Sequence, residues 1–341
     1  MFRSKELALK VARLIKTLSS GLGEVKIMHV CGTHEHTITY YGLRHLLPPN
    51  VKLIAGPGCP VCIVPAREVN EAVRLALEGI PVYTYGDMYR VPGSEMSLAQ
   101  ARAKGGDVRI VHSFKEALRQ AKEEGVFFAV GFETTAPTVA SPLSKGEVPE
   151  YLKLLVSYRL TVPALRYVLS LRASPIRGVI CPGHVSAITG AKAWDYIPKE
   201  FKIPAVVAGF EPLDVLFAVA EILAQLKRGK PRLVNEYKRV VSYEGNLAAK
   251  KYLEEVFERV DGAWRGIGTI PLSALKLKDK YTKWDARLHF KDLLKEVKGA
   301  ADLKPGCRCA EILLGLAEPK DCPFFMKGCT PLRPLGPCMV S

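Results

Sequence analysis

The chain has 341 residues, of which 48% are hydrophobic and 24% charged, a composition typical of a soluble globular protein with two or three domains. Residues 1–20 lack the unbroken apolar run of a signal peptide, and the most apolar segment, residues 205–226, contains three acidic residues that argue against a membrane span. We therefore expect a cytoplasmic protein with reduced thiols and no membrane contact.

The formal net charge is +15, and residues 227–341 hold 23 basic and 14 acidic residues. Such an excess fits either an acidic partner, an anionic ligand or nucleic acid, or simply solvated helix faces. The chain shows no helix-turn-helix pattern, no aromatic RNA-binding signature and no paired zinc-finger histidines. The basic balance alone therefore does not indicate nucleic acid, and we favour solvated helix faces.

Short apolar segments alternate with helical segments over residues 1–227. This alternation predicts parallel α/β sheets. The expected strands are residues 25–30, 51–55, 81–85, 108–111, 126–130, 178–180 and 205–208. The expected helices are residues 4–19, 66–78, 97–104, 114–124, about 150–171 with a break at Pro163, and a last one that ends near Lys227.

The sequence becomes more charged after Lys227 and ends in a segment rich in Pro, Gly and Cys. We expect three consecutive domains: an α/β domain at 1–114, a second α/β domain at 115–227 and a mainly helical, cysteine-rich domain at 228–341. The fold class predicted is α/β, with two parallel βαβ domains facing a cleft and a third domain that holds an iron–sulfur cluster.

Polar side chains and cysteines follow almost every expected strand. In parallel sheets, ligands bind beyond the carboxyl ends of the strands, so we expect these loops to form one composite site. Each of these residues alone could also be an ordinary loop or capping residue. The candidates are Cys31, His34, Glu35, Asp87, Glu133, His184 and Glu211.

Five of the nine cysteines lie in the last 35 residues: Cys307, Cys309, Cys322, Cys329 and Cys338. Without a secretory signal, such a group favours a soft-metal site over disulfides. An iron–sulfur cluster and a zinc ion both need four thiolates, and the spacing differs from that of bacterial ferredoxins. Cys307 and Cys309 are alternatives for one ligand position.

The Cys59-Pro-Val-Cys62 segment has two interpretations. A C-x-x-C pair that opens a helix suits thiol–disulfide exchange, because the helix N-terminus lowers a thiol pKa. Alternatively, the pair is half of a zinc site whose other half is Cys31 and His34. Cys31, directly after a strand, fits a ligand or nucleophile but also a lone buried cysteine, and His34 fits a proton donor or second ligand.

Taken together, the motifs resemble those of the hydrogenase maturation protein HypD family. The matching segments run in order from residue 31 to the end of the chain. They are Cys-Gly-Thr-His-Glu at 31–35, Gly-Pro-Gly-Cys-Pro-Val-Cys at 56–62, Gly-Asp-Met-Tyr-Arg-Val-Pro-Gly at 86–93, Gly-Phe-Glu-Thr-Thr-Ala-Pro at 131–137, Pro-Gly-His-Val-Ser at 182–186 and Gly-Pro-Cys-Met-Val-Ser at 336–341.

The resemblance implies a role in building the Fe(CN)2(CO) group of [NiFe] hydrogenases, as an assembly scaffold with thiol-redox chemistry, not a conventional turnover enzyme. It implies two partners, a small HypC-like maturation protein and a HypE-like cyanide donor. Cys31 would hold the iron, with Cys62 the next candidate, and Cys59 and Cys62 would be the redox-active pair. A [4Fe–4S] cluster would be bound by Cys309, Cys322, Cys329 and Cys338.

Two other functions remain open from the residues. One is an iron–sulfur-dependent thiol–disulfide oxidoreductase, which would turn over a disulfide substrate. The other is a zinc-binding nucleic-acid protein, which would be colourless and would bind DNA or RNA with a steep salt dependence.

Overall fold

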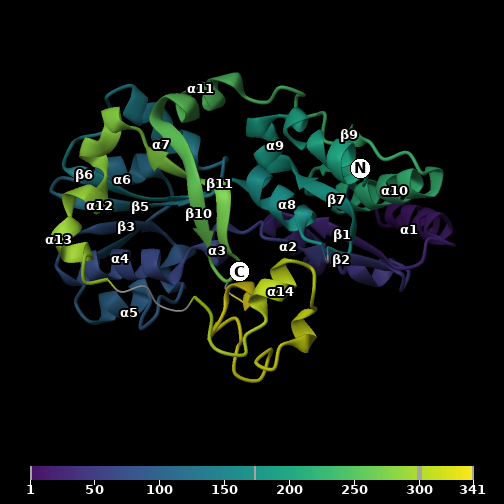
Figure 1. The fold of residues 1–341 in the computed structure, drawn as a ribbon, viewed down its shortest axis with the longest axis horizontal. Helices are drawn as coiled ribbons and strands as arrows, with labels where there is room; N and C mark the ends of the chain where they lie inside the picture. Colours follow the sequence, from purple (N-terminus) through teal and green to yellow (C-terminus); the bar gives the residue numbers. More distant parts are fainter. Residues whose placement is uncertain (1, 173, 298–301, 340–341) are drawn as a thin grey trace. The chain divides into compact units, whose positions relative to one another are not determined.

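The computed structural model describes residues 2–172, 174–297 and 302–339 (Figure 1). These residues form two compact units, each built around one parallel sheet. The first unit comprises Met1–Cys59, Ala164–Leu247 and Glu311–Glu318, and the second comprises Pro60–Pro163, Ala248–Ala310 and Pro319–Ser341.

The sheet of the first unit has five parallel strands in the order β2-β1-β7-β8-β9. Their bounds are β1 Val25–His29, β2 Val51–Ala55, β7 Ile176–Pro182, β8 Ala205–Ala208 and β9 Leu233–Asn235. The helices of this unit include α1 Lys5–Ser19, α2 Gly32–Tyr40, α9 Gly183–Thr189 and α10 Pro212–Arg228.

Helices α1 and α10 lie side by side and cover this sheet with their apolar faces (Figure 1). Val11 and Ile15 of α1 and Leu216 of α10 belong to the same buried cluster as Ile27 of β1. The hydroxyl of Ser4 accepts a hydrogen bond from the backbone N–H of Leu7 and so satisfies a free donor at the start of α1. This packing holds β1, and therefore the loop that follows it, in place.

The sheet of the second unit has four parallel strands in the order β4-β3-β5-β6. Their bounds are β3 Val82–Tyr85, β4 Val108–Val111, β5 Gly125–Gly131 and β6 Leu152–Tyr158. Helices α6 (Phe114–Gln120) and α7 (Ala136–Ser144) cover one face, and α4 (Ala66–Leu77) and α5 (Leu98–Ala103) cover the other (Figure 1).

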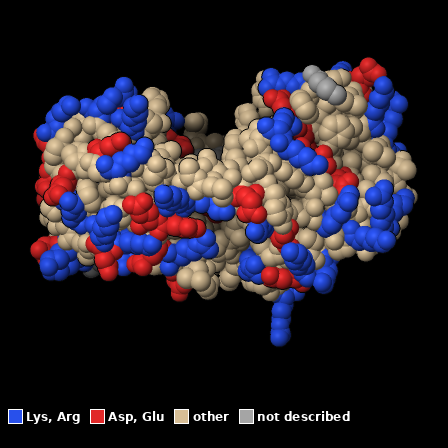
Figure 2. Space-filling model, turned by 90° about the horizontal axis from the view of Figure 1, so that it is seen from above, with Lys and Arg blue, Asp and Glu red and all other residues tan. Residues whose placement is uncertain are grey.

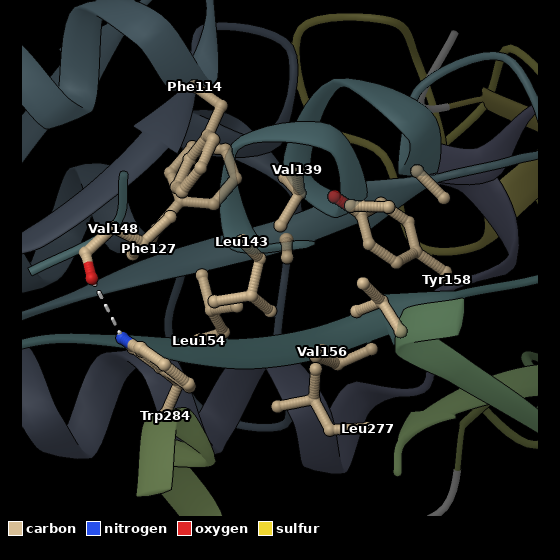
Figure 3. Close-up of a cluster of buried hydrophobic side chains, with 14 of the residues drawn as sticks. Phe114, Phe127, Val139, Leu143, Val148, Leu154, Val156, Tyr158, Leu277 and Trp284 are labelled. Carbon is tan, nitrogen blue, oxygen red and sulfur yellow. Dashed lines mark hydrogen bonds between the residues drawn. The ribbon is translucent and has the colours of Figure 1, made fainter. Parts of the chain in front are cut away.

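The core of the second unit is a cluster of aromatic and branched side chains (Figure 3). Phe114 and Phe127 pack against each other with ring centroids 4.9 Å apart, and Leu154 and Tyr158 of β6 belong to the same cluster. Trp284 closes one side, where its indole N–H donates to the carbonyl oxygen of Val148 at 3.3 Å.

The second unit also contains a long antiparallel hairpin, β10 Phe257–Trp264 paired with β11 Gly268–Leu277. The remaining helices are α3 Pro60–Ile63, α8 Thr161–Ser170, α11 Leu247–Val256, α12 Ala286–His289, α13 Lys291–Leu294 and α14 Cys309–Leu313. The short 3-10 or π turns are η1 Leu43–Leu46, η2 Met88–Arg90, η3 Ala191–Trp194, η4 Ile197–Phe201, η5 Asp279–Trp284, η6 Pro319–Asp321 and η7 Pro337–Met339.

The prediction of parallel α/β sheets is confirmed for both units, and all seven expected strands are present. The predicted helix at 150–171 is wrong in its first half, where β6 occupies Leu152–Tyr158 and only α8 is helical. The reason is that every residue of β6 is buried, including the polar Lys153 and Ser157, so apolar and polar residues do not alternate regularly along it as they do in a half-buried strand.

After Lys227 the expected helices are present as α11 to α14, but β9 and the β10–β11 hairpin, which the sequence did not predict, also lie there. Burial along β10 largely alternates with exposure, which is the strand period. Charged residues at the exposed positions gave the segment the composition of a solvated helix.

The expected consecutive boundaries at 114 and 227 differ from the segments of the two units. Strands β1 and β2 pair in one sheet with β7 and β8, whereas β3 and β4 pair in the other with β5 and β6. The chain therefore crosses between units several times, because strand pairing, not proximity in sequence, decides the sheets.

Basic and acidic side chains are interspersed over the surface that Figure 2 shows, which agrees with solvated faces as the explanation of the net charge. Among the described residues, no helix is both long and apolar enough to cross a membrane.

Candidate functional site

The sheet of the first unit reverses its strand order between β1 and β7. The chain leaves β1 toward β2 on one side and leaves β7 toward β8 on the other. Loops that diverge in this way open a crevice beyond the carboxyl ends of the strands, which is the usual ligand position in such sheets. Cys31 follows β1, and His184 follows β7 at the start of α9, so two predicted site residues flank this point.

Cys31 is a half-buried free thiol at the residue that precedes α2, with an extended backbone at φ −156°. The Gly56–Cys59 loop runs beside it, and the N–H of Gly32 donates to the carbonyl oxygen of Gly58 at 3.3 Å. A Cβ atom on Gly58 would lie 2.3 Å from the backbone nitrogen of Cys31, so this close approach requires glycine. The structure therefore brings the Cys31 loop and the start of the Cys59-Pro-Val-Cys62 segment together.

Cys59 and Cys62 are disulfide-bonded, whereas the other seven cysteines are free. Cys62 lies buried in the short helix α3. Cys181, in β7, is fully buried, and burial raises the pKa of its thiol well above its ordinary value. Its environment is that of an inert structural thiol.

Glu35 belongs to a polar network directly after Cys31. Its carboxylate accepts hydrogen bonds from both guanidinium nitrogens of Arg44 at 2.8 and 2.7 Å and from the hydroxyl of Thr39 at 2.9 Å, and it lies 2.9 Å from Nε2 of buried His29. Partial burial alone would raise the pKa of Glu35, but the hydrogen bonds with His29 and Arg44 outweigh it and lower the pKa. Glu35 therefore stays ionised and fixes the first turn of α2.

His34 is fully buried, and its Nε2–H donates to the carbonyl oxygen of Gly209 at 2.8 Å. Burial, with some repulsion from His29, lowers the pKa of His34 to about 3. The ring is therefore neutral near pH 7 and does not fit the role of an imidazolium proton donor. Its buried Nδ1 has no hydrogen-bond partner within the described part of the chain, so an acceptor lone pair is left over.

Phe210 lies between His34 and His184, a role that the sequence analysis missed. Its ring centroid is 3.9 Å from that of His184 and 4.7 Å from that of His34. Burial lowers the pKa of His184, so this ring also favours the neutral form. The three rings line the carboxyl ends of β1, β7 and β8. The only feature of the sequence that could have indicated a role for Phe210 is its place in a Gly-Phe-Glu segment, 209–211, directly after a strand.

The other three candidates have partners within the protein: backbone N–H groups for Asp87 and Glu133, and an arginine side chain for Glu211. Asp87 accepts from the N–H of Met88 at 2.9 Å, and buried Glu133 accepts from the N–H and hydroxyl of Thr161 at 2.8 and 2.9 Å. Burial raises the pKa of both carboxyls. Glu211 precedes α10 and forms an ion pair with Arg3 at 2.6 Å. These contacts show capping and anchoring, the alternative that the sequence left open.

The tail cysteines lie close together in the second unit. The Sγ atom of Cys309 is 2.9 Å from that of Cys338 and 3.3 Å from that of Cys307, and the Cys322 thiol contacts Cys307. Cys329 is buried, and its sulfur accepts a hydrogen bond from the N–H of Leu335 at 3.2 Å. The loop-rich tail thus brings four of the thiols together, those of Cys307, Cys309, Cys322 and Cys338.

Gly336 lies against this group of sulfurs. A Cβ atom there would be 2.5 Å from Sγ of Cys309 and 2.9 Å from Sγ of Cys307. The backbone from Leu335 to Cys338 therefore approaches the thiols closely, as backbone does around sulfur clusters, and only glycine leaves room for it. The tail motif begins at this glycine, and its last two residues, 340 and 341, lie outside the described residues.

The thiols differ in their proton affinity. Burial raises the pKa of Cys307 to about 12, and the contact with Cys338, with burial, raises that of Cys309 further. For Cys322, burial is outweighed by hydrogen bonds from the backbone N–H groups of Arg308, Phe324 and Phe325, which lower the pKa. Crowded thiols share protons, and a bound metal would replace those protons.

The donor set fits an iron–sulfur or thiolate metal site chemically, because it consists of sulfur alone. Four thiolate sulfurs that each lie about 2.3 Å from one metal ion would be roughly 3.8 Å from one another. The tail sulfurs would therefore have to move apart to bind a metal ion. In the part of the chain that the structure describes, no group of three or more His, Cys, Asp or Glu side chains has the arrangement of a metal site.

Comparison with known proteins gives a consistent result. Residues 6–341 match the HypD family model, described as "Hydrogenase formation hypA family". The chain is 45% identical over 333 residues to a provisionally named hydrogenase expression/formation protein of Methanocaldococcus jannaschii, with 96% of this chain and 92% of the relative covered.

Two further relatives carry the name hydrogenase maturation factor. HypD2 of Bradyrhizobium diazoefficiens is 41% identical over 355 residues, with 100% of this chain and 92% of the relative covered. HypD of Escherichia coli is 40% identical over 325 residues, with 93% and 86% covered. With a family model that covers nearly all of the sequence and relatives that match it over most of their length, the chain belongs to the HypD family of hydrogenase maturation factors.

Proposed function

We propose that this maturation factor is a scaffold on which the Fe(CN)2(CO) group of [NiFe] hydrogenases is assembled, and that Cys31 is the thiolate that holds the iron. The observation that carries the proposal is the place of Cys31, a free, half-buried thiol at the point where the first sheet reverses its strand order.

The surroundings of Cys31 suit such a cargo. Low-spin Fe(II) with cyanide and carbonyl ligands accepts soft thiolate neighbours. Its two cyanides make the unit anionic, so neutral rings and backbone N–H groups are better neighbours than carboxylates. His34 and His184 favour the neutral form, and the nearest carboxylate, Glu35, has its charge compensated by Arg44. A HypC-like partner would supply a second thiolate and a HypE-like partner the cyanide.

We assign Cys59 and Cys62 as the redox pair of the scaffold. When the dithiol closes to the disulfide, it releases two electrons and two protons, and the reverse step takes them up. The pair is disulfide-bonded here, and the Gly56–Cys59 loop lies beside the Cys31 loop. Electrons delivered to or taken from this segment would therefore act close to the iron-holding thiol.

We assign the tail cysteines Cys309, Cys322, Cys329 and Cys338 to a [4Fe–4S] cluster, which would supply one-electron transfer. Helix α3, which carries Cys62, packs against η7, which carries Cys338. Both elements belong to the second unit, so the tail sulfurs lie near the second cysteine of the redox pair.

The test is infrared spectroscopy of the complex co-purified with its small partner under anaerobic conditions. Cys31→Ser replaces a soft ligand by a hard one, so the bands of iron-bound cyanide and carbonyl should vanish. Cys181→Ala, which removes a buried inert thiol, is the matched control and should keep them. Full band intensity in Cys31→Ser would move the iron to another residue, with Cys62 next.

The disulfide between Cys59 and Cys62 also supports a second candidate, a general thiol–disulfide oxidoreductase. That function predicts repeated turnover of a small disulfide substrate with an external one-electron reductant as the donor. A scaffold instead predicts one redox cycle per assembled iron group.

A further inference from the structure

Arg265 has an unusual position for an arginine in this chain. It directly follows β10, and only 3% of its surface is exposed. Its backbone N–H donates to the carbonyl oxygen of Ile63 at 2.9 Å, and its side-chain Nε–H donates to the carbonyl oxygen of Asp302 at 3.2 Å. The first bond fixes the backbone of Arg265, and the second fixes the position of its guanidinium.

The Nη1 nitrogen of Arg265 is buried and has no hydrogen-bond partner among residues 2–172, 174–297 and 302–339. A guanidinium is always charged and presents five donors, so a buried nitrogen without an acceptor is costly. The carboxylate of Asp302 is engaged elsewhere, since its Oδ1 accepts from the N–H of Ala66 at 2.8 Å at the start of α4. The geometry leaves Nη1 as a donor without an acceptor.

Tail sulfurs are among the groups around Arg265. Ile63, to which its backbone is bonded, ends helix α3, and α3 packs against η7, which carries Cys338. The Cys338 sulfur is 2.9 Å from that of Cys309. Besides Asp302, the charged forms of Cys309 and Cys307 are the groups whose electrostatic attraction favours the Arg265 cation.

We propose that Arg265 is a positioning residue for the tail sulfur site: its guanidinium donates from Nη1 to a sulfur of the metal-loaded thiolate set and compensates the charge of that set. The inference rests on the proposed function only in that the tail binds a thiolate-held metal. Four thiolates on a 2+ ion, or on a 2+ [4Fe–4S] core, both leave a net charge of −2. A buried cation stabilises either one.

Two consequences follow from this placement. A neighbouring cation and a hydrogen bond to sulfur make reduction easier, so Arg265 should raise the reduction potential of a bound cluster. In addition, Arg265 is bonded to Ile63, the residue next to Cys62. The backbone of Arg265 therefore anchors it to helix α3 of the redox segment, while its guanidinium faces the tail sulfurs.

The first experiment uses Cd²⁺ alone as the probe, read from its thiolate charge-transfer absorption. The full chain carries Cys31→Ser, Cys59→Ser and Cys62→Ser, so that the tail supplies the reactive thiols. Arg265→Gln should weaken Cd²⁺ binding about 10- to 100-fold, as is usual for a residue that supports metal ligands. Arg265→Lys, which keeps the charge, should lose less. Arg259→Gln, at an exposed position of β10, is the matched control and should bind normally.

The second experiment measures the potential of a reconstituted cluster by anaerobic redox titration. Arg265→Gln should shift it to more negative values, whereas Arg259→Gln should not. Equal Cd²⁺ affinity in the Arg265→Gln and parent proteins overturns the inference. If no cluster can be reconstituted but the Cd²⁺ difference is present, the cluster proposal fails and the role of Arg265 stands.

A third measurement needs no variant, which covers the case in which Arg265→Gln does not fold. In the unsubstituted chain, the side-chain ¹⁵Nε resonance of Arg265 should shift when Cd²⁺ is added, because the neighbouring thiols become a charged, metal-bound thiolate set. The resonance of Arg259 should stay in place. An Arg265 resonance that does not respond to saturating Cd²⁺ contradicts the proposal.

Discussion

Individual side chains in the first unit owe their protonation to the elements that bury them. His34 and Glu35 are adjacent, yet burial lowers the pKa of His34 to about 3 while hydrogen bonds with His29 and Arg44 keep Glu35 ionised. The result is a neutral ring and a compensated carboxylate beside the Cys31 thiol. Neither state follows from residue type alone, since an ordinary histidine titrates near 6.5.

His34 should therefore remain neutral in the folded protein down to about pH 4. Its folded pKa lies below the unfolded value of about 6.5, so the unfolded chain binds the extra proton first. The contribution of neutral His34 to the free energy of unfolding is therefore fully present above about pH 6.5, and it is lost as the pH falls toward 3. Imidazole ¹⁵N NMR should show the Nε2–H tautomer at pH 6. An imidazolium signal at that pH would contradict this assignment.

At the scale of secondary-structure elements, two glycines allow loops to pack closely against neighbouring backbone or side chains. Gly58 places the Gly56–Cys59 loop against the residues that follow β1, and Gly336 places the end of the tail against two cysteine sulfurs. Neither glycine has a positive φ. Lack of space therefore requires glycine at both positions, not backbone conformation.

Gly58→Ala should destabilise the protein by about 3 kcal/mol, because the new Cβ would lie 2.0 Å from the backbone carbon of Val30, which cannot move without shifting β1. Chemical denaturation measures the difference. Gly86→Ala is the matched control: its Cβ would meet Ile110 at an ordinary 3.6 Å, so its stability should change by less than about 1 kcal/mol. Equal stability of the two variants would mean that the loops do not approach so closely.

At the scale of the whole molecule, the chain is shared between two units. The tail cysteines belong to the second one, in which Arg265 lies in the turn between β10 and β11. Thiols that are 31 residues apart in sequence, from Cys307 to Cys338, converge there. A metal that joins them would tie the end of the chain to the core of this unit and so stabilise the fold as well as carry electrons.

Protein purified without oxygen should be brown and contain about four cluster irons. Cys322→Ala should lose the cluster, because the thiol with the lowered pKa is the one best prepared to bind iron. Cys307→Ala is the matched comparison and should keep the colour, as the family resemblance implies. Iron analysis and absorption near 400 nm distinguish them. Colourless protein with one zinc ion per chain would refute the cluster.

The sequence by itself determined the local elements and the family. Strand-ending motifs such as Cys31–Glu35 placed reactive residues at the carboxyl ends of strands, because apolar runs and Gly-rich turns are local signals. The same local signals failed for β6, whose complete burial removed the alternation that marks a strand, and for hairpin β10–β11, whose exposed positions mix charged residues such as Arg259 with uncharged ones such as Leu272.

Only the tertiary structure decided which strands share a sheet and what each polar residue does there. Strand pairing joined β1 to β7 across more than 140 residues, which put Phe210 between His34 and His184. It also showed that Glu133 caps a helix and that Arg265, one of 49 basic residues, is buried with a donor that has no partner among the residues that the structure describes. Burial and long-range contact determine pKa and hydrogen bonding, and neither is encoded in a short stretch of sequence.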